Sequence, residues 1–255
     1  MRALTATMRN AVAEALANRA ALGSSMIVMI VNDVVWVAFW ILFFHRVGNL
    51  HGWDGHRVLL LLSVITTAAG IALGVLANAR RIGVMAVEGE LDAVLTLPVP
   101  PLAYVLLRRI EPTNIGDFVF GVVLFTVTGH PTPERIAIFV VVVLLSATLL
   151  TGFLVLTGSL AFFAGRSEGS ELGFQAMILL GSYPVDVFAG TARIVLYSVI
   201  PAAFVSSVPA KLIDSFDLGA LAWLAIVAGV FAIAGWMTFT AGLRRYTSGA
   251  VWTRA

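Results

Sequence analysis

"IAIFVVVVLLSATLLTGFLVLTGSLAFFA", residues 136–164, decides the fold class. The run contains no acidic or basic residue and exceeds the roughly 20 apolar residues that cross a bilayer as one helix. Long stretches of this kind also explain a mean hydropathy of +0.97 over 255 residues. The sequence therefore predicts an all-α membrane protein with a single transmembrane domain over residues 1–255. Four further, mostly apolar runs cover residues 21–44, 57–78, 113–129 and 218–243.

The segment of residues 165–210 is apolar but interrupted. "SYPVDVFAG" and "VIPAAFVSSVP" place prolines and charged residues within it. Proline bends or ends a helix, and broken backbone at membrane depth must be covered by protein or a watery cavity. We predict a full span near 169–188 and a re-entrant element near 191–210; the reverse assignment stays open, and either gives six spans. The residues that define this broken region are Tyr183, Pro184, Asp186, Arg193, Pro201 and Pro209.

The distribution of Lys and Arg predicts the orientation, because short cytoplasmic loops carry an excess of these residues. A cytoplasmic N-terminus leaves only Arg46, Arg57, Arg135 and Lys211 outside, with Arg193 undecided. We therefore expect a multi-pass protein of the cytoplasmic (inner) membrane with both termini inside. The eleven arginines on the inside are then Arg2, Arg9, Arg19, Arg80, Arg81, Arg108, Arg109, Arg166, Arg244, Arg245 and Arg254.

This orientation fixes the order of the predicted segments. Spans one and two occupy residues 21–78, spans three and four residues 113–164, and span six residues 218–243. Residues 165–210 hold span five and the re-entrant element, and residues 244–255 form a cytosolic tail.

The first 20 residues lack the short apolar core and small-residue cleavage site of a signal peptide. Leu4, Met8, Val12 and Leu16 recur every fourth residue and share one side of a helix. A helix lying in the membrane interface over residues 1–20 fits this pattern. A plain cytosolic cap on the first span is the alternative.

The cytoplasmic loop of residues 79–112 contains "VEGELDAVLTLPVPP" between two arginine pairs. Arginines at both ends suit the anionic inner leaflet. Between them the pattern predicts a short helix that prolines stop. Leu91, Val94 and Leu95 form its apolar side, and Glu88, Glu90 and Asp92 supply its charge. A soluble motor needs a stiff element of this kind to move the spans; a solvated surface helix is the alternative. The residues expected to contact such a motor are Glu88, Gly89, Glu90, Leu91, Asp92, Val94 and Leu95.

The same loop resembles the one that follows the second span in permeases of the ABC-2 family. Its "G-x-L-D-x-x-L-x-x-P" and following "P-L" correspond to Gly89, Leu91, Asp92, Leu95, Pro98, Pro101 and Leu102. A "Y-P" and an "I-P-x-A-F-V-x-x-x-P-A" pattern are matched by Tyr183, Pro184, Pro201, Ala203, Phe204, Val205, Pro209 and Ala210. The "L-x-R-Y-x-S" ending is matched by Leu243, Arg245, Tyr246 and Ser248.

The resemblance implies an exporter-type ABC permease with six transmembrane helices, an interfacial N-terminal helix, a cytosolic coupling helix and a re-entrant element before the last span. It implies a dimer of ABC ATPase subunits and a second permease, identical or sibling, as partners in the lipid bilayer, and no nucleic acid. ATP and Mg would be bound by the ATPase, and no cofactor by this chain. The apolar composition suits a lipid-like, amphipathic or drug-like substrate.

Several chemistries lack their residues in this sequence. There is no "GxxxxGK[ST]" phosphate loop, so we expect no ATP hydrolysis by the chain itself. There is no cysteine, and the external histidines match no standard ligand spacing, so no metal site is expected. An ion-gradient-driven transporter remains the alternative, and an intramembrane enzyme a more remote one. The histidine group comprises His45, His51 and His56 with Asp54.

Charged residues within the apolar runs are candidate functional positions. Asp33, beside Asn32, lies midway along the first span, where a charge costs at least ~2.5 kcal/mol, so it is expected at a translocation path or permease dimer interface. A structural pairing or a proton site stays open for it. Asp117 is expected to lie near a helix N-terminus, where the backbone dipole favours a carboxylate. Asp186 and Arg193 are expected to pair and pin the re-entrant turn.

Two further patterns carry structural expectations. Trp36, Trp40 and Trp53 are expected to mark the outer membrane interface. Gly70 and Gly74 form a "GxxxG" pair that permits close helix packing inside a bundle.

Overall fold

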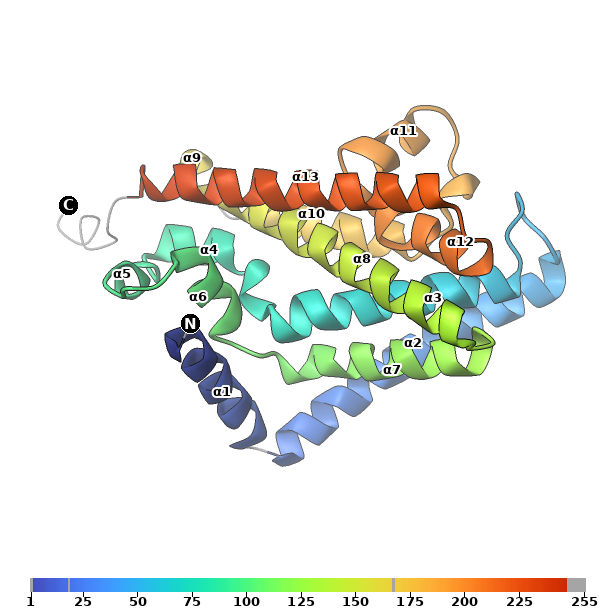
Figure 1. Cartoon of the computed structure of the whole chain (residues 1–255), viewed down its shortest axis with the longest axis horizontal. Coiled ribbons are helices and arrows are strands. Elements are labelled where there is room, and N and C mark those ends of the chain that lie inside the picture. The colour runs from blue at the N-terminus through green and yellow to red at the C-terminus, as the bar shows by residue number, and fades with distance from the viewer. Residues whose placement is uncertain (1, 18, 167, 247–255) are drawn as a thin grey trace.

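The computed structural model describes residues 2–17, 19–166 and 168–246, and these ranges form a helical bundle without a strand (Figure 1). The all-α prediction is confirmed. Four helices are long and apolar enough to cross a membrane, and two bent helix pairs raise this number to as many as six. The four are Leu22–Val47, Gly55–Val75, Pro133–Ala164 and Leu218–Leu243.

The elements follow the chain as a series of long helices joined by short ones. The N-terminal half contains α1 (Arg2–Ala17), α2 (Arg19–Val47), α3 (Gly55–Ala69), η1 (Gly70–Val75), η2 (Ala77–Ala79), α4 (Ile82–Glu88), α5 (Asp92–Leu95), α6 (Pro101–Leu107) and α7 (Pro112–Thr128). The C-terminal half contains α8 (Pro133–Ser159), α9 (Ala161–Ala164), α10 (Glu168–Gly181), η3 (Val185–Val187), α11 (Gly190–Ser198), η4 (Ala203–Ser207), α12 (Val208–Asp214) and α13 (Leu218–Leu243).

Glycines permit a close helix contact between α8 and α13. A Cβ on Gly152 of α8 would lie 2.7 Å from the backbone nitrogen of Ala232, and a Cβ on Gly235 of α13 would lie 2.6 Å from the carbonyl oxygen of Gly152. Helices without a side chain at the crossing bring their backbones together and gain van der Waals contact, which drives association in lipid. The two longest apolar runs therefore form a packed pair.

A second group is formed by α2, α3 and α7. Gly70 and Gly74, at the π-helical end of α3, face the α7 backbone at Phe118 and near Asn114. The predicted close packing of this glycine pair inside the bundle is confirmed. On the other side of α7, a Cβ on Gly116 would lie 2.9 Å from the carbonyl oxygen of Met26 on α2.

The predicted full span at 169–188 is wrong in its length. The helix α10 ends at Gly181 and has 14 residues, about 21 Å, against roughly 30 Å of hydrocarbon. It ends there because Ser182 and Pro184 begin a turn that leads into η3. Beyond it, Gly190–Ser198 and Ala203–Asp214 form a pair bent by 69°, with Pro201 in the break.

Several short helices lie at one end of the bundle. The helices α4, α5 and α6 lie at the same end as α1 and the C-terminal end of α13 (Figure 1), and α1 packs against α6. On α1, Met8, Val12 and Leu16 are exposed and share one side, as an interfacial helix requires.

The flanks of the bundle are apolar and uncovered. Both α2 and α13 expose most of their apolar side chains, the reverse of a water-soluble protein. These faces are available to lipid or to another membrane helix. They include Ile27, Val28, Val31, Val35 and Leu42 on α2, and Trp223, Ile226, Val230, Ile233 and Trp236 on α13.

Candidate functional site

Residues 82–107 form a compact segment of three short helices, α4 to α6. Gly89 ends α4 with a left-handed φ of 80°, a conformation that glycine adopts without strain. Pro101 begins α6, where a missing N–H costs nothing. The predicted short helix is thus present as α5, four residues long, between two further helices.

Glu90 links the two ends of the 82–107 segment by hydrogen bonds. Its Oε1 accepts a hydrogen bond from Arg81 (3.1 Å), just before α4, and its Oε2 one from Arg108 (3.3 Å), just after α6. The three side chains are about one third exposed, so the charges are partly screened. Asn78 Nδ2 adds a buried hydrogen bond to the carbonyl of Val105 in α6 (2.9 Å). Glu90 therefore braces this segment, a role that its predicted contact with a motor did not include.

The apolar residues of the segment face two ways. Leu91 and Val94 are each 1% exposed and belong to the chain's own core, whereas Leu95 is 45% exposed. The prediction that all three form one outward apolar side is therefore wrong for Leu91 and Val94. A four-residue helix followed by a proline break turns back onto the bundle and buries its inner side.

The outer surface of the segment is formed by other residues. Val87 and Leu97 are 46% and 39% exposed, and Glu88 is exposed beside them. Val87, Leu95 and Leu97 are the large apolar side chains that the segment exposes, and together with Glu88 we call them the outer face. The sequence pattern did not identify Val87 and Leu97 as surface residues, because it was interpreted as a single continuous helix.

The last span reaches the same segment through Tyr246. This side chain lies against Leu91 and Asp92, and burial together with the Asp92 carboxylate raises the pKa of its phenol to about 12. Phe162 packs on the Tyr246 ring edge-to-face. The predicted C-terminal motif thereby meets the predicted coupling motif in space; Ser248 of that motif lies outside the described residues.

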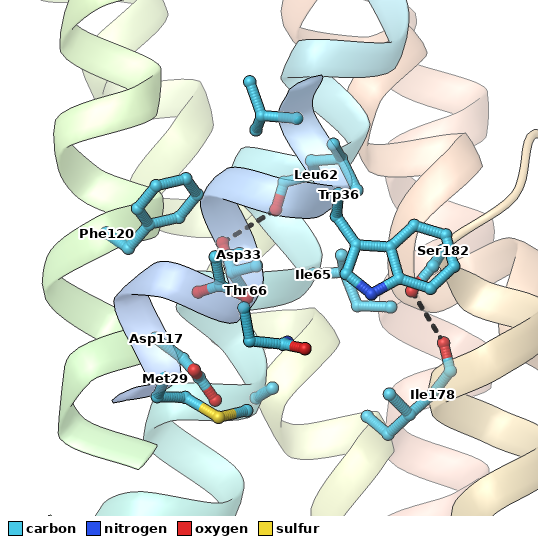
Figure 2. Close-up of a pocket in the computed structure, with 13 residues that line it drawn as sticks. Met29, Asp33, Trp36, Leu62, Ile65, Thr66, Asp117, Phe120, Ile178 and Ser182 are labelled. Atoms are coloured by element: carbon cyan, nitrogen blue, oxygen red, sulfur yellow. Dashed lines mark hydrogen bonds between the residues drawn. The ribbon is translucent and has the colours of Figure 1, made fainter. Parts of the chain in front are cut away.

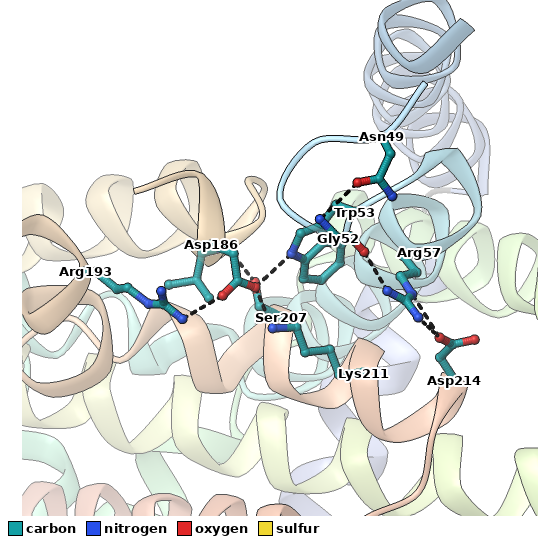
Figure 3. Close-up of polar contacts among 10 residues, drawn as sticks. Asn49, Gly52, Trp53, Arg57, Asp186, Arg193, Ser207, Lys211 and Asp214 are labelled. Atoms are coloured by element: carbon teal, nitrogen blue, oxygen red, sulfur yellow. Dashed lines mark hydrogen bonds and ion pairs between the residues drawn. The ribbon is translucent and has the colours of Figure 1, made fainter. Parts of the chain in front are cut away.

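At the opposite end of the bundle, Asp186 is the centre of a polar network (Figure 3). Its carboxylate accepts hydrogen bonds from Trp53 Nε1 (2.8 Å), Arg193 (2.7 Å) and Lys211 Nζ. The predicted Asp186–Arg193 pair is confirmed, and it joins α11 to η3. Lys211 of α12 and Trp53 of the α2–α3 loop extend the network to two more elements.

The contacts in this network explain why the carboxyl of Asp186 stays ionised. Burial alone would raise the pKa of this carboxyl, but the hydrogen bonds from Lys211 and Trp53 and the charges of Lys211 and Arg193 lower it below its usual value. A second ion pair, Arg57–Asp214 at 2.9 Å, lies beside it. The broken region is thus held to the α2–α3 loop by the Trp53–Asp186 hydrogen bond and to α3 by the Arg57–Asp214 ion pair.

The remaining residues of the broken region shape it. Tyr183 packs edge-to-face on Trp36 and Trp40 of α2. Pro184 precedes η3, and Val185 N donates to Ser207 Oγ (3.0 Å). Pro201 and Pro209 are buried, the first in the 69° break and the second in the first turn of α12.

Two of the three tryptophans expected at the outer membrane interface are covered by the protein itself. Trp40 and Trp53 are only 4% and 1% exposed, because Tyr183 covers the first and Asp186 holds the second inside. Of the external group, Asp54 is used locally, since its Oδ1 accepts from Arg57 N at the start of α3 (2.9 Å). Among the described residues no three His, Cys, Asp or Glu side chains meet as metal ligands.

Asp33 lies in the wall of a cavity of about 80 Å³ among α2, α3, α7 and α10 (Figure 2). Asn32 is exposed at its rim. The carboxyl of Asp117 joins it from α7, and the two side chains interact directly. Asp33 is 6% and Asp117 3% exposed.

The interpretation of Asp117 as a helix-terminal carboxylate is wrong. The helix α7 begins at Pro112, so Asp117 lies in its second turn, and Gly116 lets α2 pack close enough to cover it. Sequence reasoning also missed Thr66 and Ser182, which line the same cavity. The sequence did offer one indication of this site, because Asp33 and Asp117 each place a carboxylate within an apolar run.

Apolar helices of spanning length, a buried acidic cavity and a braced helical segment at one end are features of a polytopic membrane transport subunit. Residues 29–250 match the model of the ABC-2 family transporter proteins, and the chain belongs to this family. The predicted family is confirmed. Comparison with curated proteins and with solved structures gave no match.

Proposed function

We propose that this chain is the permease subunit of an ABC exporter, and that a separate ATPase subunit supplies the energy. Membership of the ABC-2 family supports a permease. The observation that carries the coupling is the 82–107 segment, which is braced by Glu90 and presents the outer face of Val87, Glu88, Leu95 and Leu97. A stiff segment with exposed apolar residues suits a groove on a soluble partner.

The rest of the arrangement follows from this proposal. The arginines around the 82–107 segment support a cytoplasmic location for it, for α1 and for the end of α13. The exposed apolar faces of α2 and α13 support a second permease, identical or sibling, and lipid as neighbours. ATP and Mg bind the ATPase dimer, the membrane is the cytoplasmic one, and this chain catalyses no reaction.

The substrate class in this proposal is lipid-like, amphipathic or drug-like. A molecule that leaves the bilayer sideways meets the largely apolar faces of α2 and α13. Export is the direction that suits such a substrate, since it starts from the inner leaflet.

Reconstitution tests the proposal. Vesicles that contain the chain and an ATPase subunit captured with it should show ATP-dependent transport, and vesicles with the chain alone should not. The matched control is a Leu95→Asp, Leu97→Asp variant, which places charge on the outer face and should not capture the ATPase. Capture of the ATPase by that variant as efficiently as by the wild type would remove the coupling role.

A gradient-driven transporter is the second candidate, and the Asp33–Asp117 pair favours it because buried carboxylates within spans are typical of proton- and sodium-coupled carriers. The same vesicles separate the two. Uptake driven by a pH or sodium gradient in the absence of ATP and of any partner would establish the second candidate instead.

A further inference from the structure

The cavity between α2 and α7 is lined mainly by apolar groups and hydrogen-bond acceptors, and the Asn32 amide and the Trp36 indole N–H are donors in its wall (Figure 2). The hydroxyl of Thr66 donates to the carbonyl of Leu62 (2.8 Å), and that of Ser182 to the carbonyl of Ile178 (2.8 Å). Their protons are therefore used within their own helices, and lone pairs remain for the cavity. No Lys, Arg or His lines it.

Two acceptors in this cavity are without a partner. Asp33 Oδ2 and Asp117 Oδ1 are buried and make no hydrogen bond in the structure, although each residue is more than nine tenths buried. A buried carboxylate without a partner is costly. Two carboxyl groups in direct contact away from water cannot both stay ionised unless a proton or a cation lies between them.

The charge of the pair selects a monovalent cation. A pair that holds one proton carries one negative charge, and two carboxyls with two hydroxyls fall short of the six or more oxygens that calcium takes. Eight of the thirteen lining residues are apolar, and the aromatic rings of Trp36 and Phe120 are among them. Aromatic faces attract organic cations.

The size and the rim of the cavity indicate how much of a ligand enters. A volume of about 80 Å³ holds a small group, whereas a drug-sized ligand needs roughly 300 Å³ or more. Asn32 lines the cavity and is also exposed, so the cavity reaches the uncovered side of α2 at this residue. Val28, Val35 and Phe39 lie four residues before, three after and seven after Asn32, so they share its helix face, and all three are exposed.

We propose that the Asp33–Asp117 cavity binds the ammonium group of a long-chain primary amine, with the alkyl chain along the exposed face of α2. The head group donates its N–H bonds to the two unpartnered carboxylate oxygens. The proposal deepens the proposed function by naming an amphipathic amine as the substrate class, and it rests on that function only for transport. Binding itself needs no ATPase.

The test is equilibrium binding of dodecylamine, protonated at neutral pH, to the purified chain in lipid nanodiscs. Empty nanodiscs supply the background from partition into lipid, and 1-dodecanol supplies a neutral ligand of the same length. The wild type should show one saturable dodecylamine site per chain and none for dodecanol. Equal binding of dodecanol would overturn the proposal.

Variants locate the site. Asp33→Asn and Asp117→Asn each remove one charge-assisted acceptor, so binding should weaken about tenfold or more. Glu134→Gln, an exposed carboxylate at the start of α8, should leave it unchanged. The asparagine variants remove a buried charge, so we expect them to fold. A thermal unfolding scan is the control for this. Unchanged affinity in both would overturn the proposal.

A competition experiment with sodium tests whether the cavity binds an inorganic cation instead of the amine. Replacement of choline chloride by sodium chloride at constant ionic strength should leave dodecylamine binding unaltered. Displacement of dodecylamine by sodium would assign the cavity to an inorganic cation and overturn the proposal. Failure of amine binding leaves the permease function intact, and failure of ATP-dependent transport leaves amine binding intact, so the two results are separable.

Discussion

Leu91 and Leu95 are one helical turn apart, yet they have opposite environments. Leu91 is 1% exposed and packs in the core beside Tyr246, whereas Leu95 is 45% exposed on the outer face of the 82–107 segment. The first holds the segment to the bundle, and the second is free to meet a partner. A change at each position separates stability from association.

Leu91→Ala should lower the free energy of unfolding by about 2 to 5 kcal/mol, since it leaves a cavity at a fully buried position. Leu95→Ala should change it little, because that side chain is half exposed, but should weaken capture of the ATPase. Thermal unfolding in detergent and co-purification measure the two effects. A loss of stability in Leu95→Ala as large as that in Leu91→Ala would contradict the two-sided arrangement.

Asp186 makes the network of Figure 3 dependent on pH. The pKa of its carboxyl is lowered in the folded state, so its contribution to stability is complete above the unfolded value of about 3.9 and is lost as the pH falls through the folded pKa. At about pH 6 the wild type should therefore unfold at a higher temperature than Asp186→Asn.

Below about pH 4 this advantage should shrink and then disappear, because the wild-type carboxyl becomes neutral as well. Unfolding temperatures of both proteins across this range give the measurement. A difference that stays constant down to pH 2 would show that the charge of Asp186 has no part in holding α11 and α12.

At the scale of single helices, the apolar runs predicted much of the fold. The last run, residues 218–243, coincides with α13, and residues 113–129 differ from α7 by one residue at each end. Hydropathy suffices there because lipid demands a continuous apolar helix. In residues 165–210 proline marked the breaks but did not determine how long each piece is.

The candidate site was less predictable, because its residues come from different helices. Asp33 was identified as a candidate because a charge within a membrane span costs free energy, whereas its partner Asp117 was assigned to a helix end. The inward turn of Leu91 and Val94 depends on the fold around the 82–107 segment, which helical periodicity alone does not contain. Pairings across helices are set by packing rather than by local pattern.

The α8–α13 contact yields a prediction about helix packing. Gly152→Ala places a Cβ about 2.7 Å from the α13 backbone, so the helices must separate, at a cost of about 1 to 3 kcal/mol. Gly229→Ala, on α13 with no atom within 4 Å of the new Cβ, should have no cost and should stabilise the helix slightly. Thermal unfolding of the two variants should shift in opposite directions; equal shifts would contradict the close contact.

At the scale of the whole molecule, the 82–107 segment is connected to the bundle at several points. Arg80 pairs with Glu171 of α10 (2.8 Å), and this ion pair lies next to the Arg81–Glu90–Arg108 brace. Hydrogen bonds from Arg80 and Gln175 lower the pKa of Glu171 despite its partial burial. Tyr246 connects the end of α13 to α5. We therefore expect the segment to move as one body with α10 and the end of α13, to which these contacts join it.

Glu90→Gln should loosen that body without removing its outer face. Glutamine keeps the size of the side chain but loses the charge that holds Arg81 and Arg108, while Val87, Leu95 and Leu97 stay exposed. We therefore expect the ATPase to bind as before and to hydrolyse ATP, with less transport per ATP. The loss of folding stability should be small, about 1 kcal/mol or less, because the pairs are partly exposed.

Glu88→Gln is the matched control for this variant, since Glu88 is two residues away and exposed on the outer face. A rim charge mainly affects the rate and register of association, so its loss should leave the ratio of transport to ATP hydrolysis unchanged. Both activities are measured on the same vesicles with the ATPase subunit present. A lower ratio in Glu88→Gln, with a normal one in Glu90→Gln, would place the coupling in direct contact of the carboxylates with the ATPase and not in the internal brace.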